Sequence, residues 1–287
     1  MGVDSRQYIF ACELGSREDA PADFDPNNSL PDFQEGLFLP RADPDWLGRS
    51  AYPPRVLALL PAGLLIAPHP AAKAATQLVR FDRLCFVEVG RILLHGWIRV
   101  VGNGTDRTLL YNTRYRGAVD SFLWKLRARF LEGSDVCQTE AARLGPPLNL
   151  KFEYALAREL GAAESIRMSL FRPPQGFVRR AFGFKRAGTV PADLVVLTNS
   201  RLLWITDRNG GIHARYGSIV RYAPLSKVAS LARVSDARQH SLSVSLGAPD
   251  VEWRIPVSPE QWQDAAQLEN AFGRRRQSGV SALERGA

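Results

Sequence analysis

Apolar residues occur mainly in short runs rich in β-branched and large side chains, and turn-forming residues separate these runs. In residues 193–207, DLVVLTNSRLLWITD, two such runs flank Thr198-Asn199-Ser200-Arg201. Asn and Ser favour turns, so this stretch predicts a β-hairpin. A similar stretch, residues 55–69, RVLALLPAGLLIAPH, has Pro61-Ala62-Gly63 at the place of the turn. The sequence therefore predicts two related hairpins.

The segments that follow the two hairpins also match at a nearly constant spacing. Three pairs of matching segments show this spacing: Leu64-Leu65-Ile66 with Leu202-Leu203-Trp204 at a shift of 138, residues 81–87 with 225–231 at a shift of 144, and Phe130 with Phe272 at a shift of 142. Insertions in a duplicated unit are tolerated in its loops, which accounts for small changes of shift. We therefore expect one structural unit to occur twice.

Each predicted unit continues with paired strands and ends in a helix. The expected strand pairs are residues 97–101 with 108–111 and 242–246 with 251–255, and the expected helices are residues 118–131 and 259–272. In the first helix, Val119, Phe122, Leu126 and Phe130 recur at helical steps, which leaves the side with Lys125, Arg127 and Arg129 to solvent. In the second, Ser258, Pro259 and Gln261 form a helix start signal. Each helix thus has an apolar face to bury.

This order of elements resembles the pleckstrin-homology superfold, in which antiparallel strands form a split barrel that one C-terminal helix closes. LVVLTNSRLLWITD followed by PLSKVASL at residues 224–231 resembles the GRAM and bacterial pleckstrin-homology-like families. The resemblance covers residues 194–272 well and residues 56–131 more weakly. It implies a mostly β protein with two such barrels in tandem. It says little about activity, because these motifs are turn and strand signatures.

We expect the chain to have five parts. These are an acidic N-terminal arm (1–29), a divergent first domain (30–132), a linker with a short helix at residues 150–160 (133–163), a second domain that begins with a strand at residues 165–171 (164–273), and a basic, frayed tail (274–287). A length of 287 residues suits two domains.

Charge is distributed unevenly along the chain. The formal net charge is +8, but residues 1–50 hold ten acidic residues against four arginines, a net of −6, which leaves +14 for the rest. The acidic arm could therefore lie across a basic surface of the protein and mask it. The alternative is an arm that is simply solvated.

The sequence favours a cytoplasmic location. No apolar segment typical of a secretory signal precedes Cys12, and no window approaches the roughly 20 apolar residues that span a bilayer. The three cysteines are far apart and indicate neither a disulfide framework nor a zinc site. Peripheral contact with the inner face of the membrane remains an option in this interpretation.

Residues 177–186, FVRRAFGFKR, mix cations with aromatic residues and suit an anionic lipid surface. The predicted lipid- or anion-binding residues are Arg172, Arg179, Arg180, Lys185 and Arg186, and the predicted membrane-inserting residues are Phe177, Phe182 and Phe184. We expect this segment in the loop between the first two strands of the second domain, which pleckstrin-homology domains commonly use for head groups. The alternative is a strand or hairpin with its Phe side chains in the core.

A second basic group could contact nucleic acid, but its aromatic neighbours and helical position are more typical of a core with a solvated face. Its members are Arg107, Arg114, Arg116, Lys125, Arg127 and Arg129. The four histidines have no Cys, Asp or Glu at catalytic or metal-ligand spacing, so we expect no enzyme activity, no metal and no cofactor.

The preferred hypothesis is therefore a non-catalytic adaptor that binds a protein or peptide partner. Sheet edges of split barrels can accept an added strand, and two barrels can share one bivalent partner. The competing hypothesis is attachment to anionic lipid through residues 177–186.

Overall fold

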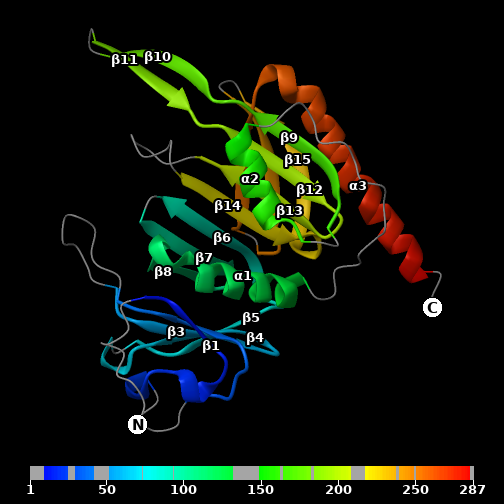
Figure 1. The fold of residues 1–287 in the computed structure, drawn as a ribbon. Coiled ribbons are helices and arrows are strands. Elements are labelled where there is room, and N and C mark those ends of the chain that lie inside the picture. The colour runs from blue at the N-terminus through cyan, green and yellow to red at the C-terminus, as the bar shows by residue number, and fades with distance from the viewer. Residues whose placement is uncertain are drawn as a thin grey trace. The chain divides into compact units, whose positions relative to one another are not determined.

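The computed structural model of the protein describes residues 10–24, 30–41, 52–72, 74–92, 94–131, 149–161, 164–181, 184–207, 217–236, 239–248 and 250–284. The chain forms two compact units (Figure 1). Unit 1 contains Met1–Leu84 and Val89–Glu132, and unit 2 contains Cys85–Glu88 and Gly133–Ala287. The protein is mostly β, as the sequence predicts. Its strand pairs are antiparallel, and none of the sheets in the described ranges closes into a barrel.

Unit 1 has a five-stranded sheet, a group of three longer strands and one helix. The five-stranded sheet has the order β1 (Cys12–Leu14), β2 (Gly36–Leu39), β3 (Arg55–Leu60), β4 (Gly63–Pro68) and β5 (Gln77–Arg80). The three strands that follow are β6 (Leu84–Ile92), β7 (His95–Gly102) and β8 (Thr105–Asn112), and the helix is α1 (Arg116–Leu131). Short 3-10 turns lie at Arg17–Asp19, Ala22–Phe24, Pro70–Ala72 and Thr113–Tyr115.

The five-stranded sheet of unit 1 is apolar on both faces because both faces are covered. Its outer face packs against the N-terminal segment, in a cluster of Leu14, Phe24, Leu30, Phe33, Phe38, Val56, Ala58, Leu65 and Ala67. The alternate residues of β3 and β4, among them Leu57 and Leu64, are also fully buried. A strand with two covered faces needs an unbroken apolar run rather than alternation. This explains the long apolar stretch in residues 56–68.

The N-terminal segment also makes ionic contacts with α1. Glu13 lies 3.1 Å from the Lys125 ammonium, and Glu35 lies 3.7 Å from the Arg129 guanidinium. Glu13 of the acidic arm thus pairs with a basic residue of α1, whereas Glu35 follows the arm in the sequence. Arg127 is only 3% exposed, so the expectation that this side of α1 faces solvent is wrong at that residue.

Unit 2 has four strands of its own in its first sheet where unit 1 has five, and then, like unit 1, three strands and a helix. A hairpin is inserted after its first strand. Its first sheet has the order β14 (Gly217–Pro224), β13 (Arg201–Thr206), β12 (Asp193–Thr198) and β9 (Ile166–Arg172), with Cys85–Glu88 of β6 beside β14. The second sheet contains β15 (Val228–Ser235), β16 (His240–Leu246) and β17 (Glu252–Val257), and the inserted hairpin contains β10 (Gln175–Ala181) and β11 (Phe184–Val190). The helices are α2 (Leu150–Glu159) and α3 (Trp262–Glu284), with 3-10 turns at Leu225–Lys227 and Pro259–Gln261.

Both predicted hairpins are confirmed. In unit 2, β12 and β13 are joined by Asn199-Ser200, and in unit 1, β3 and β4 are joined by Pro61-Ala62. The predicted spacing also holds: β4 and β13 begin at Gly63 and Arg201, and β6 and β15 begin at Leu84 and Val228. These pairs of strands start 138 and 144 residues apart, the shifts found in the sequence. The order of elements is therefore duplicated.

The C-terminal helix is longer than predicted. Ala265, Leu268 and Phe272 form its buried stripe, and α3 packs against β9 and β15 of unit 2. The expectation of a frayed tail from Arg274 is wrong, because α3 continues to Glu284. Once packing has nucleated a helix, each further residue adds a hydrogen bond at a smaller entropic cost than the first turn.

Within the described ranges, no helix is both long enough and apolar enough to cross a membrane.

Candidate functional site

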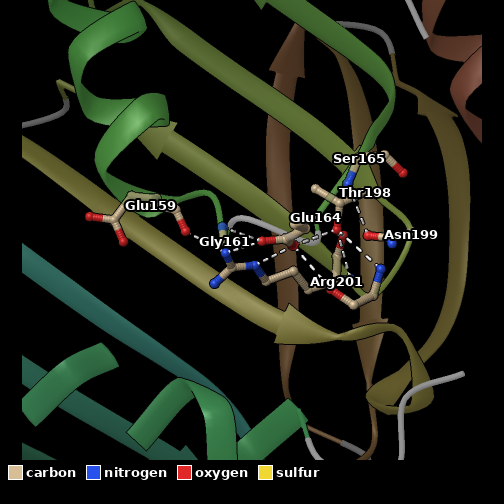
Figure 2. Close-up of polar contacts among 8 residues, drawn as sticks. Glu159, Gly161, Glu164, Ser165, Thr198, Asn199 and Arg201 are labelled. Carbon is tan, nitrogen blue, oxygen red and sulfur yellow. Dashed lines mark hydrogen bonds and ion pairs between the residues drawn. The ribbon is translucent and has the colours of Figure 1, made fainter. Parts of the chain in front are cut away.

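The Thr198-Asn199-Ser200-Arg201 motif forms a buried polar network at the turn between β12 and β13 (Figure 2). The Thr198 hydroxyl accepts hydrogen bonds from the backbone N–H groups of Ser200, at 3.2 Å, and Arg201, at 3.0 Å, which closes the turn. Asn199 exchanges two bonds with Ser165: its side-chain oxygen accepts from the Ser165 N–H, and its own N–H donates to the Ser165 carbonyl. The turn is therefore tied to the segment that precedes β9.

Glu164 is the centre of this network (Figure 2). One carboxylate oxygen accepts bonds from Arg201 Nε at 2.7 Å, Thr198 Oγ1 at 2.7 Å and Ser200 Oγ at 3.0 Å. The other accepts from the Gly161 N–H at 3.1 Å and from Arg201 Nη2, and the same Arg201 nitrogen donates to the Glu159 carbonyl at the end of α2. Burial alone would raise the pKa of Glu164, but the Arg201 guanidinium and the hydroxyl bond hold it below its ordinary value.

The residues that carry the family resemblance thus have a structural function. They fasten the end of α2 and the start of β9 onto the first hairpin of unit 2. Phe152 of α2 extends this attachment, because it is buried and its ring lies 5.3 Å from that of Phe171 on β9. We conclude that this motif is not a ligand site.

Arg172, which the sequence analysis assigns to lipid or anion binding, is buried at the end of β9. Its guanidinium pairs with Asp193 and donates a 2.7 Å bond to the Pro191 carbonyl. The side chain is only 4% exposed. Because an internal carboxylate already binds this arginine, we remove Arg172 from the proposed anion-binding set.

The other predicted lipid-binding cations lie on the β10–β11 hairpin, where the sequence analysis expects a loop. The pairing register places Arg179 opposite Arg186 and Arg180 opposite Lys185. Phe177 and Phe184 also lie on these strands, whereas Phe182 lies outside the described residues. The structure thus brings four of the five cations together on one two-stranded hairpin and separates Arg172 from them.

The strongest candidate for a binding site is the edge of the second sheet of unit 2. In this sheet β15 pairs with β16 on one side, and none of the described strands pairs with it on the other. Its outward positions carry small or modest side chains: Ala229 and Ser230 are exposed, and Val234 is 39% exposed. An unpaired edge strand offers backbone N–H and C=O groups to an incoming strand wherever α3 does not cover it. The register shift between Val228 and Ser230 is the one irregularity along its pairing with β16.

An open groove of about 690 Å³ lies between this edge and α3. β15 contributes Ser230 and Leu231, and α3 contributes Glu269, Asn270, Phe272, Gly273 and Arg274. Leu231 and Phe272 are mostly buried and give the groove an apolar floor, while Gly273 and Arg274 are exposed at its rim. The volume falls within the range of small-ligand and peptide sites.

Arg233 fixes the spacing between β15 and α3. Its Nε donates a 2.9 Å bond to Glu269 Oε2, and its Nη1 donates a 3.3 Å bond to the Trp262 carbonyl. Its guanidinium also lies 4.7 Å from the centre of the Trp262 ring, a cation–π distance. The groove is therefore preorganised, because a strand, a helix and an ion pair fix its walls before any ligand arrives.

Sequence reasoning predicts a strand at residues 228–231 and a helix up to Phe272, but it does not indicate that they form a groove. In the sequence, both walls have the pattern of ordinary core elements. The site becomes evident only when the structure places β15 at the edge of its sheet. In the part of the chain that the structure describes, no group of three or more His, Cys, Asp or Glu residues is arranged to hold a metal ion.

No protein-family model, curated protein or solved structure matches this chain. The resemblance to pleckstrin-homology-like and GRAM-like domains therefore rests on the sequence motifs and on the order of elements.

Proposed function

We propose that this protein is a non-catalytic binding protein, built from two pleckstrin-homology-like units, that captures an extended segment of a protein partner. The peptide adds as a strand to the free edge of β15 and lies in the groove beside α3. The tandem fold is part of this proposal, and it is supported by the order that both units share, a first sheet followed by three strands and one helix. The observation that carries the binding function is the edge of β15, with which no further described strand pairs, next to an open groove.

Strand addition accounts for the two features of this site together. Main-chain hydrogen bonds to an edge strand supply affinity for almost any extended peptide, and the neighbouring groove supplies selectivity for alternate side chains. Natural proteins usually block long exposed edges with charges, prolines or covering segments. On β15 the single charged side chain, Arg233, is committed to Glu269, so the edge stays accessible.

The test begins with the full chain as bait for a displayed library of random peptides. The selected peptides are then made in two forms, with backbone nitrogens methylated at odd positions in one and at even positions in the other. A strand bonds to its neighbour through every second residue. One form should therefore lose binding, and the other should keep it. Equal binding of the two forms would contradict strand addition, and so would a library that yields no binder.

A pair of matched substitutions locates the binding site. Ser230→Trp places a large side chain in the groove and should abolish binding of the selected peptides. Ser226→Trp changes an exposed residue just before β15 that does not line the groove, and it should leave binding unchanged. The reverse pattern, or loss of binding in both variants, would place the peptide elsewhere.

The register of the β10–β11 hairpin favours a second candidate function, attachment to anionic membranes. Like charges directly opposite one another destabilise a strand pair, and the register has two such pairs at consecutive positions, which belong to opposite faces of the hairpin. Anionic head groups would offset this repulsion for the pair on the face that meets the membrane, at roughly 1 kcal/mol per basic residue near the surface.

Sedimentation with phosphatidylserine vesicles tests the membrane candidate. A variant with Arg179, Arg180, Lys185 and Arg186 changed to Ser should lose sedimentation at low salt. A control that removes the same charge from four exposed arginines, Arg41, Arg80, Arg114 and Arg254, should keep it. Absence of sedimentation of the unaltered chain would end this candidate without affecting the groove.

A further inference from the structure

The strand β15 has an equivalent in the chain whose corresponding edge is already paired. This equivalent is β6, because the two strands begin 144 residues apart and each is the first of three consecutive strands. Within unit 2, Cys85–Glu88 of β6 lie beside β14, and Glu88 forms an ion pair with Arg221 of β14 at 2.5 Å. The pairing of β6 with β14 therefore indicates which kind of strand suits the edge of β15.

The counterpart of β14 in unit 1 is β5. Arg80 of β5 lies opposite Gly63 on β4, and Pro224 of β14 lies opposite Arg201 on β13. Gly63 and Arg201 are themselves equivalent, because they begin the matched strands β4 and β13. β5 ends the five-stranded sheet, and none of the described strands pairs with its outer side. The chain thus has an unpaired counterpart of β6 and an unpaired counterpart of β14.

The groove beside α3 opens at the part of β15 that this pairing would need. Cys85–Glu88 correspond to residues 229–232, and Ser230 and Leu231 in this range line the groove. Because α3 packs against β15, this opening sets where a further strand can reach the backbone of β15.

Exposed apolar side chains occur on the same two edges. Six large apolar residues of the described ranges are exposed, and the two that lie on strands are Leu78 of β5 and Val234 of β15. They are 44% and 39% exposed, whereas Tyr222, which occupies the position of Leu78 on β14, is fully buried. A single exposed apolar residue is ordinary, but one on each of two matching edges indicates that the two edges cover each other.

The side chains that would meet at this contact are neutral. The counterparts of Arg221 and Glu88 are Gln77 on β5 and Ala232 on β15, so the pairing buries no unpartnered charge there. β5 has only four residues and can form few backbone bonds with a neighbour. An interface of this size is typical of weak association, so it should form only as the chain concentration rises.

We propose that the chain associates with copies of itself head to tail, with β5 of one copy added to the edge of β15 of the next. This inference rests on the proposed strand addition at β15 and names a second copy of the chain as the partner. Because the two edges differ, each copy keeps one free edge after pairing. The contact therefore generates open chains or rings rather than a symmetric dimer.

Sedimentation velocity of the full chain at increasing concentration tests the association. The unaltered chain should form species larger than dimers. Leu78→Lys and Val234→Lys should each remain single at the same concentrations, because lysine on an edge strand opposes pairing. The matched control is Leu94→Lys, which changes a residue that is 58% exposed in the turn between β6 and β7 and should associate like the unaltered chain.

An equal mixture of the two edge variants tests the pairing of unlike edges. The Val234→Lys chain keeps β5 and the Leu78→Lys chain keeps β15, so the mixture should form species of twice the chain mass and nothing larger. Gln77→Glu added to the first and Ala232→Arg added to the second should together tighten this pair about tenfold relative to either change alone, if Gln77 lies beside Ala232.

The outcomes separate this inference from the proposed function. An unaltered chain that stays single at every concentration would overturn self-association, and so would larger species in either edge variant or a mixture that forms no pairs. Loss of binding by only one methylated peptide form would still support strand addition at β15. Equal binding of the two methylated forms would contradict peptide capture, even where the mixture forms pairs.

Discussion

The two units share one order of elements but differ at two equivalent places, the first hairpin and the first strand of the three-strand group. In unit 1 the hairpin turn is exposed at Pro61-Ala62, and in unit 2 the equivalent turn is buried. The strand β6, most of which lies outside unit 2, is buried along almost all of its length, whereas β15 of unit 2 is buried only at Val228 and Leu231 and forms a sheet edge. Strands at equivalent places in the order of elements thus differ: β6 is paired on both sides, and β15 is an edge strand.

The hairpins show how the difference arises. Position 63 is Gly in unit 1 because a Cβ there would lie 2.3 Å from the Val79 carbonyl oxygen, so the next strand occupies that space. The equivalent position in unit 2 is Arg201, whose guanidinium reaches Glu164 and the end of α2. In unit 1 backbone packing closes the turn, and in unit 2 a side-chain network does so. Unit 2 is therefore anchored at its first hairpin and open at β15.

The largest effect is expected from Arg201→Met. Removing one member of a buried, hydrogen-bonded ion pair leaves Glu164 uncompensated and should cost about 3–5 kcal/mol. Urea unfolding followed by the fluorescence of the buried Trp204 and Trp253 measures this in unit 2. The control, Ala62→Ser in the exposed turn of unit 1, should change the free energy of unfolding by no more than about 0.5 kcal/mol. Equal effects of the two changes would contradict the contrast between the turns.

A smaller effect is expected from Gly63→Ala. The added methyl group would collide with the backbone of β5, and overpacking of this kind costs about 1–3 kcal/mol. Gly247→Ala is the matched control, because its Cβ would lie 3.7 Å from the nearest backbone oxygen, an ordinary contact. Calorimetry of both variants measures the difference. Unchanged stability of Gly63→Ala would show that β5 does not constrain the hairpin.

The smallest effect concerns acid stability. The pKa of Glu164 in the folded chain lies below its ordinary value of 4.5, because the bonds from Arg201 and Thr198 outweigh burial. The carboxylate therefore contributes its full stabilisation above about pH 4.5, and this contribution is lost as the pH falls through the lower folded value. Free energies of unfolding measured between neutral pH and this range should decline less in Glu164→Gln than in the unaltered chain.

The matched control for this measurement is a glutamate with a lowered pKa that lies at the surface. Glu252 also has a lowered pKa, through a hydroxyl bond from Ser243 that outweighs slight burial, but it lies at the surface. Glu252→Gln should leave the acid dependence nearly unchanged. An identical decline in Glu164→Gln and the unaltered chain would contradict the assignment to Glu164.

The sequence predicts the fold of each unit further than it predicts the site. Hairpins, strand pairs and helix starts depend on local patterns, so the positions of β12, β13 and α2 could be expected. The pairing of Arg172 with Asp193 joins residues 21 positions apart on neighbouring strands, which no local pattern indicates. The groove could not be predicted either, because the edge position of β15 depends on how strands distant in the sequence pair. For residues 177–186 the sequence predicts a loop, with a strand or hairpin as the alternative, and the structure places most of them on the β10–β11 hairpin.

Amide hydrogen exchange along β15, measured with and without a selected peptide, tests the central claim most directly. In the free chain, alternate amides of β15 should exchange quickly, because they point away from β16. With the peptide bound, these same amides should become protected, while the amides of β6 stay unchanged. A bound peptide that leaves the exchange of β15 unaltered would contradict strand addition at this edge.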